Sequence, residues 1–328
     1  MKAIVYERYG PPEVLQLREV ERPSPRDNEA LVKIHASSIN FGDRVLVSGR
    51  PLVSRLWSGL LKPKHKILGT DVAGRVEAVG GKVGQFRPGD EVFGDISACG
   101  FGAYAEYVSV PEDVLTLKPS NSTFEEAAAV PQAAVVALQG LRDKGRIQPG
   151  EKVLINGASG GIGTFAVQIA KTYDTEVTGV CSTRNLELVR SIGADHAVDY
   201  TVEDFTRGKR RYDLILDIVA NRSTSDYLRV LNPGGRYVAV AFNPSSLFLG
   251  SVISKREGKR ASSLAHRASV DDLNQMRGLI EAGKVAPVID RRFPLSEVPE
   301  AMRYLGGGSH RGKVIIYVGD RRMNLGRP

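Results

Sequence analysis

A glycine-rich turn that joins a buried strand to an apolar helix constrains the fold of this chain more than any other feature. A strand is predicted over Lys152–Asn156, the residues Gly157–Gly163 read GASGGIG, and an apolar helix follows over Ile162–Tyr173. Glycines at this spacing let the backbone approach a pyrophosphate closely, and the helix N-terminus adds free N–H donors and a positive dipole end. The order strand, turn, helix therefore predicts a dinucleotide-binding Rossmann unit.

The segments on either side of this turn differ in character. Residues 1–120 contain short strands separated by Gly and Pro turns, which is typical of a compact β-rich barrel or sandwich. Thr123–Glu126 fits a capping box before an Ala-rich helix. From Lys152 onward strands and helices alternate, which predicts a doubly wound parallel sheet and an α/β fold. Its further strands are expected over Glu176–Cys181, Asp213–Val219 and Arg236–Phe242, and its further helices over Asn185–Ile192, Ser223–Leu231 and Val270–Ala282.

The composition is that of an ordinary globular protein. Of the 328 residues, 42% are hydrophobic and 25% are charged, which excludes intrinsic disorder. No apolar run approaches the ~20 residues that span a bilayer, and the first residues lack the apolar region of a signal peptide. The cysteines, Cys99 and Cys181, are too few for a disulfide framework or a four-cysteine zinc site. We expect a cytoplasmic protein of two domains.

The formal net charge of +8 is spread along the chain, with one denser run over Lys255–Arg267. We interpret this run as a solvated surface segment, and contact with an anion or a nucleic acid is the alternative. Because no recognised nucleic-acid motif or interleaved aromatic residue accompanies it, no nucleic-acid partner is expected.

The end of the second Rossmann strand indicates which dinucleotide binds. An NAD site places an acidic residue there to accept a hydrogen bond from the ribose 2′-hydroxyl. This strand ends instead in Val180–Arg184, VCSTR, without a carboxylate. Ser182 can donate to a 2′-phosphate and Arg184 can pair with it, so the sequence predicts NADPH. An arginine of the helix surface is the alternative interpretation, but a cation at a helix N-terminus opposes the dipole.

Several ordered motifs resemble those of the medium-chain dehydrogenase/reductase superfamily, and most closely its zinc-independent quinone oxidoreductase branch, the ζ-crystallin-like group. Apart from the glycine turn, they are Ser38–Asp43 (SINFGD), Gly69–Val76 (GTDVAGRV), Phe86–Gly94 (FRPGDEVFG), Gly102–Tyr107 (GAYAEY) and Arg311–Val314 (RGKV).

The resemblance implies a GroES-like catalytic domain built from residues 1–122 and 287–328, with a Rossmann NADP-binding domain over residues 123–286. The last strand, Lys313–Val318, is then expected to return to the first domain, and the active site to lie between the domains. Family members often pair through an edge strand of the cofactor domain, so we expect a homodimer that uses Arg236–Phe242.

The resemblance also carries site residues. It places Asn40 and Asp43 before the nicotinamide, where Asn40 would donate to an acceptor oxygen and Asp43 would orient neighbours or relay a proton; a structural turn around Gly42 is the alternative. It implies cofactor contacts at Gly160, Gly161, Ile162, Tyr200, Phe242 and Lys313. For Tyr200 and Lys313 an ordinary surface tyrosine and an edge-strand lysine stay open.

Departures from family patterns narrow the chemistry. Asn40 and Thr70 stand where zinc-dependent members have a Cys and a His ligand, so no metal is expected. Val45 and Val136 replace a tyrosine and a threonine that many quinone reductases carry, which predicts a more apolar pocket without a hydroxyl proton donor there.

We therefore expect an NADPH-dependent reductase of quinones or α,β-unsaturated carbonyls. The alternatives are an enoyl-thioester reductase and a non-enzymatic, NADPH-regulated binding protein of the crystallin or RNA-binding type. The segment Gly49–Ile67, with Trp57 and several leucines between basic residues, is either a short helix packed on its domain, a lid over the substrate or a weak membrane contact.

Overall fold

The computed structural model describes residues 1–240 and 258–319. Two compact units make up the chain. The first unit contains Met1–Gln132, Ala268–Glu281 and Pro287–Pro328, and the second contains Ala133–Arg267 and Ala282–Ala286. The boundaries of these units differ from the expected domain boundaries at residues 123–132 and 268–281, which belong to the first unit. No helix in the described ranges is long and apolar enough to cross a membrane.

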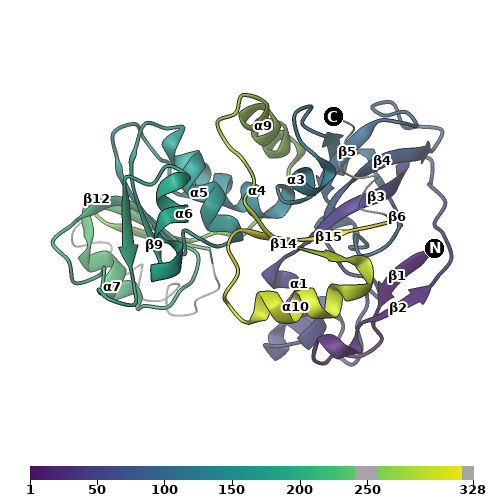
Figure 1. The fold of residues 1–328 in the computed structure, drawn as a ribbon, viewed down its shortest axis with the longest axis horizontal. Coiled ribbons are helices and arrows are strands. Elements are labelled where there is room, and N and C mark those ends of the chain that lie inside the picture. The colour runs from purple at the N-terminus through teal and green to yellow at the C-terminus, as the bar shows by residue number, and fades with distance from the viewer. Residues whose placement is uncertain (241–257, 320–328) are drawn as a thin grey trace. The chain divides into compact units, whose positions relative to one another are not determined.

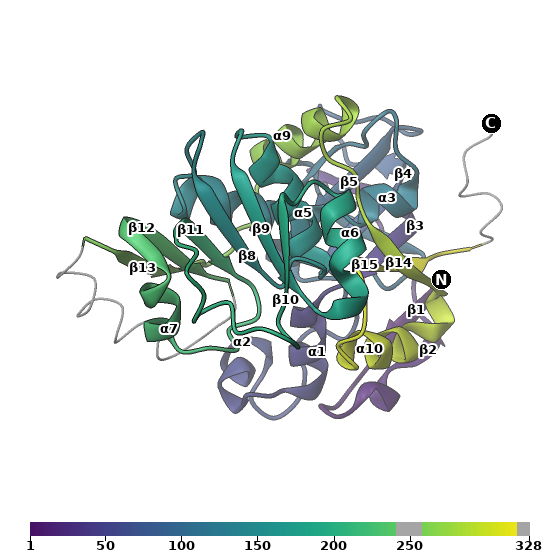
Figure 2. The same ribbon diagram turned by 60° about the vertical axis from the view of Figure 1, so that its left-hand side comes forward.

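The second unit is built on a six-stranded parallel sheet (Figure 2). Its strands are β8 (Lys152–Asn156), β9 (Glu176–Cys181), β10 (His196–Asp199), β11 (Tyr212–Asp217), β12 (Leu231–Ala239) and β13 (Arg260–Ser263), in the order β10-β9-β8-β11-β12-β13. This is the Rossmann order, in which the chain reverses direction across the sheet between β8 and β11, and a ligand crevice forms at the carboxyl ends of those strands. The predicted α/β class is confirmed.

Helices connect these strands where the apolar periodicity predicted them. α5 (Gly161–Lys171) packs on β8 and β9, and α6 (Leu186–Ser191) on β9 and β10. α7 (Thr224–Arg229) begins at a capping box between Ser223 and Asp226. α4 (Pro131–Gln139) continues into a π-helical turn over Gly140–Lys144.

Two expectations about this unit are wrong. Of the strand expected to form the dimer edge, Arg236–Phe242, the residues 236–239 lie within β12, and β13 pairs with the outer side of β12. Phe242 lies outside the described residues. The basic run is not a solvated segment throughout, because β13 forms part of it and the buried Lys259 ammonium donates to the Leu228 carbonyl.

The first unit contains a seven-stranded sheet (Figure 1). Its path is β14 (Ile289–Pro294), β15 (Lys313–Tyr317), β3 (Glu29–Ile39), β4 (Asp71–Val79), β5 (Glu91–Asp95) and β7 (Leu115–Leu117), and β6 (Tyr107–Pro111) also pairs with β3. β15 runs antiparallel to β3, with Val314 opposite Ile39. The expected return of the last strand to the N-terminal part of the chain is therefore confirmed. A separate hairpin joins β1 (Lys2–Val5) to β2 (Gln16–Glu19).

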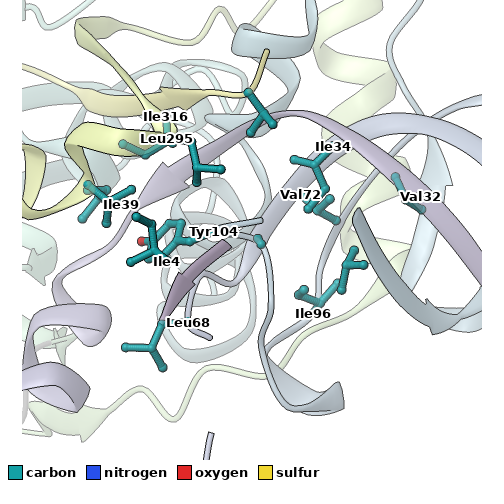
Figure 3. Packing of buried hydrophobic residues seen from close by; sticks show 14 of the residues in the cluster. Ile4, Val32, Ile34, Ile39, Leu68, Val72, Ile96, Tyr104, Leu295 and Ile316 are labelled. Carbon is teal, nitrogen blue, oxygen red and sulfur yellow. The ribbon is translucent and has the colours of Figure 1, made fainter. Parts of the chain in front are cut away.

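Apolar side chains from both ends of the chain form the core of this unit (Figure 3). Ile4, Ile39 and Ile316 come from three different strands, and each belongs to one continuous buried cluster. The buried ring of Tyr104 lies in the same cluster. The core therefore fixes β3 and β15 together, and both strands carry polar side chains discussed below.

Short helices complete the first unit. They are α1 (Phe41–Ser48), α2 (Arg55–Ser58), α3 (Phe124–Ala128), α9 (Val270–Glu281) and α10 (Val298–Gly306). The capping box predicted at Thr123 is present, since its hydroxyl accepts from the Glu126 N–H and the Glu126 carboxylate accepts from the Thr123 N–H. Single 3-10 turns occur at Pro12–Val14, Leu52–Ser54, Ser97–Cys99, Glu112–Val114, Thr183–Asn185 and Leu295–Glu297.

Candidate functional site

The glycine turn lies between β8 and α5, at the carboxyl edge of the parallel sheet. Gly157 has a φ of +90°, a conformation that side chains other than glycine rarely adopt. A Cβ at Gly163 would lie 2.0 Å from the Gly157 carbonyl oxygen. The first turn of α5 therefore packs directly on the backbone of the loop, which requires glycine at both positions.

The start of α5 has the properties of a phosphate site. Gly160 is the N-cap and supplies no side-chain cap, so the first N–H groups of this 11-residue helix are not covered by a side chain. A Cβ on Gly160 would meet only the Gly157 carbonyl, at 3.5 Å, so this side of the turn is open to a ligand. Gly160, Gly161 and Ile162 thus come together at a positive helix end, and this cradle fits the pyrophosphate of a dinucleotide.

The residues expected to select the dinucleotide lie together at the next strand ends. Ser182 follows β9, and its hydroxyl accepts a weak hydrogen bond from Asn185 Nδ2 at 3.3 Å. Arg184 is exposed and has no carboxylate partner among the described residues. Tyr200 is 46% exposed, and its N–H donates to the Cys181 carbonyl. Ser182, Arg184 and Tyr200 therefore all follow the carboxyl ends of the neighbouring strands β9 and β10.

A carboxylate that the sequence analysis did not consider stands at these strand ends. Asp199 ends β10 directly opposite Cys181, and its Oδ1 accepts from the N–H and the hydroxyl of Thr201. A hydrogen bond from Thr183 contributes most to holding the pKa of Asp199 below its usual range. Its position at the end of a strand could have identified Asp199 from the sequence, but that strand is β10 rather than β9.

A second polar group missed by sequence reasoning lies at the carboxyl ends of β8 and β11. Asn156 Nδ2 is 2.8 Å from both Asp217 Oδ1 and the Tyr227 hydroxyl oxygen. The Tyr237 hydroxyl donates to Asp217 Oδ2 at 2.8 Å, and the two tyrosine rings stack 4.8 Å apart. Burial is the main cause that raises the pKa of both tyrosines. The cluster therefore joins the ends of β8 and β11 to α7 and β12.

In the first unit, Asn40 and Lys313 meet in a buried network around Asp71. Lys313 Nζ donates to Asn40 Oδ1 at 2.6 Å and lies 3.4 Å from Asp71 Oδ2. Asn40 Nδ2 lies 3.0 Å from both Thr70 Oγ1 and Asp71 Oδ2. Asp71 also accepts from the Gln132 N–H and from the Ser38 hydroxyl. The Lys313 side chain is only 3% exposed, so its ammonium serves this network.

Asp43 stands beside the network at the start of α1. Its Oδ2 accepts from the Asn40 N–H at 2.8 Å and from the Tyr104 hydroxyl at 2.7 Å. Its other oxygen is buried without a hydrogen-bond partner among the described residues. Burial raises the pKa of Asp43 to about 6. The structure thus brings together Asn40, Asp43 and Lys313, all three predicted from sequence.

These residues do not fit a zinc ion. The positions that correspond to zinc ligands in zinc-dependent members carry the Asn40 amide and the Thr70 hydroxyl, whose Nδ2 and Oγ1 atoms lie 3.0 Å apart. The Lys313 ammonium donates to the same Asn40 amide. An ammonium repels a metal cation, and zinc sites use Cys, His and carboxylate ligands. The described parts of the chain contain no group of three His, Cys, Asp or Glu residues able to hold a metal.

An apolar cavity of about 360 Å³ lies beside α1 in the first unit. Phe41, Val45 and Met302 line it together with Arg44 and Arg50. Val45 stands where many quinone reductases carry a tyrosine, and its isopropyl group leaves that wall without a hydroxyl.

Comparison with known proteins agrees with both units. Residues 26–120 match the family model described as Alcohol dehydrogenase GroES-like domain, and residues 192–316 match the one described as Zinc-binding dehydrogenase. The second description names a metal for which Asn40, Thr70 and Lys313 are unsuited ligands. The likeness therefore concerns the fold and the family.

Relatives with stated activities cover nearly the whole chain. The mitochondrial NAD(P)H oxidoreductase RTN4IP1 of Bos taurus is 34% identical over 97% of this chain and 89% of its own length. The chloroplastic NADPH-dependent alkenal/one oxidoreductase of Arabidopsis thaliana is 33% identical over 97% of this chain and 79% of its own.

A solved structure, the quinone oxidoreductase from Coxiella burnetii, superposes with a TM-score of 0.87 at 31% identity and covers 97% of this chain and 99% of its own. These likenesses support an enzyme that uses a nicotinamide cofactor. The chain belongs to the medium-chain dehydrogenase/reductase superfamily, in its quinone oxidoreductase branch.

Proposed function

We propose that this protein reduces quinones or α,β-unsaturated carbonyls with NADPH. The observation that carries the choice of cofactor is the strand end at Ser182 and Arg184. There a hydroxyl and a guanidinium, which has no carboxylate partner among the residues that the structure describes, replace the carboxylate of an NAD site. The choice of acceptor is supported by relatives named as an alkenal/one reductase and as quinone oxidoreductases.

The second unit has the groups needed to bind such a cofactor. We assign the pyrophosphate to the N–H groups at Gly160, Gly161 and Ile162, and the 2′-phosphate to Ser182 and Arg184. Tyr200 offers an exposed ring and hydroxyl beside the same strand ends. The Asp199 carboxylate lies near the same strand ends. Its negative charge repels a phosphate, so we infer that binding of the 2′-phosphate depends on the positive charge of Arg184. When bound, NADPH supplies the hydride.

In the first unit we assign positioning roles to Asn40 and Asp43. Both Asn40 amide hydrogens have acceptors, Thr70 and Asp71, so we infer that Asn40 holds Lys313 and the start of α1 in place instead of donating to the acceptor. Asp43 fixes the Asn40 backbone. We propose that reduction proceeds without a metal ion, because charge on the acceptor oxygen of a quinone or enone is already delocalised and fixed dipoles suffice to stabilise it.

The test of the cofactor assignment is Arg184→Ala, titrated with NADPH and NADH. Loss of a charge-assisted contact to phosphate should weaken NADPH about 10- to 100-fold, while NADH affinity changes less than about threefold. Arg190→Ala is the matched control, since Arg190 is an exposed cation on α6, the helix that follows the turn containing Arg184. Equal losses for both cofactors would contradict the assignment.

Two features of the proposal concern the whole protein. We expect a homodimer, and the sheet edges available for pairing in the described residues are β10 and β13 rather than β12. The cytoplasmic location is a further expectation, although the relatives named above are mitochondrial and chloroplastic proteins. An enoyl-thioester reductase or a non-enzymatic binding protein is distinguished from the proposed enzyme by measuring NADPH oxidation with a panel of quinone, enone and enoyl-thioester acceptors.

A further inference from the structure

The segment Gly49–Ile67 in the first unit presents apolar side chains to solvent to an unusual degree. Its exposed residues include Trp57, at 74%, and Leu61, at 95%. The others are Leu52, Val53, Leu56 and Leu60, and Phe41 of the adjoining helix α1 is also exposed. Soluble surfaces rarely gather so many large apolar side chains, and such groups mark an interaction site.

The same segment is strongly basic. Between Asp43 and Asp71 the chain contains no acidic residue. The basic residues in this interval are Arg44, Arg50, Arg55, Lys62, Lys64 and Lys66. None of these six cations has a carboxylate partner within 4.0 Å in the described parts of the chain. Other surface cations of the protein do form ion pairs with carboxylates. The apolar side chains are therefore flanked by uncompensated positive charge.

The exposure is built into the fold of the first unit. The Tyr9 hydroxyl donates to the Gly59 carbonyl at 2.5 Å and lies 2.9 Å from Ser58 Oγ. The Arg55 guanidinium stacks 4.5 Å from the centre of the Tyr9 ring, and its Nε donates to the Gly49 carbonyl. The N- and C-terminal ends of α2 are thus tied to Tyr9, so the loop holds its apolar side chains outward instead of collapsing on the core.

We propose that Gly49–Ile67 docks the protein on the surface of membranes that contain anionic phospholipids. Apolar and aromatic side chains that insert at the headgroup level, with lysines and arginines beside them, are the combination that binds such a surface peripherally. A second copy of the chain is a poorer occupant, because a symmetric contact would bring the same six unpaired cations against one another. A lid over a neutral acceptor would leave these cations without a counter-charge.

Trp57 makes the proposal directly measurable, since it is the only tryptophan in the chain. The full-length protein is mixed with vesicles of phosphatidylcholine alone or with about one third phosphatidylserine. With the acidic vesicles we expect co-sedimentation, a blue shift of tryptophan emission and quenching by brominated acyl chains, with binding at least about tenfold stronger than to phosphatidylcholine and weakened by salt. Unchanged emission together with no co-sedimentation would overturn the proposal.

Matched variants separate the apolar from the ionic contribution. Leu60→Ser with Leu61→Ser removes exposed apolar groups without touching the core and should weaken binding about tenfold or more. Val202→Ser, which removes an 81% exposed apolar residue of the second unit, should leave binding unchanged.

Lys62→Gln, Lys64→Gln and Lys66→Gln together should abolish the preference for acidic lipid. The same loss of charge at the exposed Lys144, Lys209 and Lys284 should not. Equal effects of the two triple variants would contradict a specific membrane-binding surface. A leucine variant that binds vesicles normally would also contradict it, whether its oligomeric mass changes, as for a contact between copies, or its KM for apolar quinones changes, as for a lid. NADPH affinity is measured on every variant, so that misfolding or failure of the proposed enzymatic function is recognised separately.

Discussion

Among single residues, Lys313 and Asp71 form an ion pair in which both side chains are almost completely buried. Lys313→Met leaves Asp71 without its cation, and we expect the free energy of unfolding to fall by about 3 kcal/mol or more. Lys82→Met removes the exposed pair with Asp27 and should cost less than about 1 kcal/mol. Urea denaturation of both variants checks this, and similar small losses would show that Lys313 is not part of a rigid network.

Asp43 predicts a pH dependence of stability. Burial raises its pKa to about 6 in the folded protein, against about 3.9 in an unfolded chain. The folded state therefore binds the proton more tightly, and this group lowers the free energy of unfolding as pH rises from about 4 to 6. The penalty is absent below that interval and complete above it, on the order of 2–3 kcal/mol.

The corresponding experiment compares wild type with Asp43→Asn by urea denaturation at several pH values. The amide does not titrate, so the variant should gain stability relative to wild type as pH rises from about 4 to 7. Glu21→Gln, at an exposed position, controls for the loss of one carboxylate and should show no comparable trend. Parallel curves for wild type and Asp43→Asn would mean that Asp43 is not buried as described.

At the scale of elements, the packing of α5 on its loop yields a contrast between two helix glycines. A methyl group at Gly163 meets the backbone of Gly157 and Ala158 at 2.0 to 2.8 Å, so Gly163→Ala must displace the helix or the turn. We expect a loss of at least about 2 kcal/mol in stability and weaker NADPH binding. Gly278→Ala in α9 has nothing within 4 Å of its new methyl group and should gain about 0.5–1 kcal/mol.

Thermal unfolding and NADPH titration of the two variants decide this comparison. If Gly163→Ala binds NADPH as tightly as wild type, the close approach of helix and loop does not support the cofactor site.

The sequence predicted some strands at their exact residues and missed others, and the difference has a local physical reason. β8 and β9 match the predicted residues, because buried parallel strands are continuous apolar runs between clear turn signals. β13 reads RASS and offers neither apolar alternation nor β-branched residues. Only its pairing with β12 makes it a strand, and its presence removed the expected dimer edge.

The candidate site likewise has one part that the sequence could predict and one that it could not. The phosphate turn could be predicted because its glycines, strand and helix are contiguous in the sequence. The contact of Lys313 with Asn40 joins residues 273 positions apart, and no spacing argument predicts which atoms such residues present to each other. The resemblance placed both residues in a functional region, but it assigned Lys313 to the cofactor, whereas the structure pairs it with Asn40 and Asp71.

In the whole chain, a strand near the C-terminal end, β15, pairs with the early strand β3 in the sheet of the first unit, and the second unit is formed mainly by residues between them. α9 belongs to the first unit, whereas the expected domain boundaries include it in the Rossmann domain. Val270–Glu281 follows the Rossmann strands in sequence, yet Asn274 accepts from Thr116 and Glu281 accepts from the Ser120 N–H. Those contacts place the helix in the first unit.

Hydride transfer from NADPH to a conjugated acceptor is measured by following nicotinamide absorbance with a panel of acceptors. The panel holds an ortho-quinone, a para-quinone, a simple enone, an enoyl thioester and a saturated ketone, each with NADPH and with NADH. We predict acceptor-dependent oxidation of NADPH with the quinones or the enone, and no oxidation with the saturated ketone. With NADH, kcat/KM should be at least about tenfold lower. Oxidation with the enoyl thioester alone, equal use of both cofactors, or tight NADPH binding without turnover would contradict an NADPH-dependent reductase of quinones or enones.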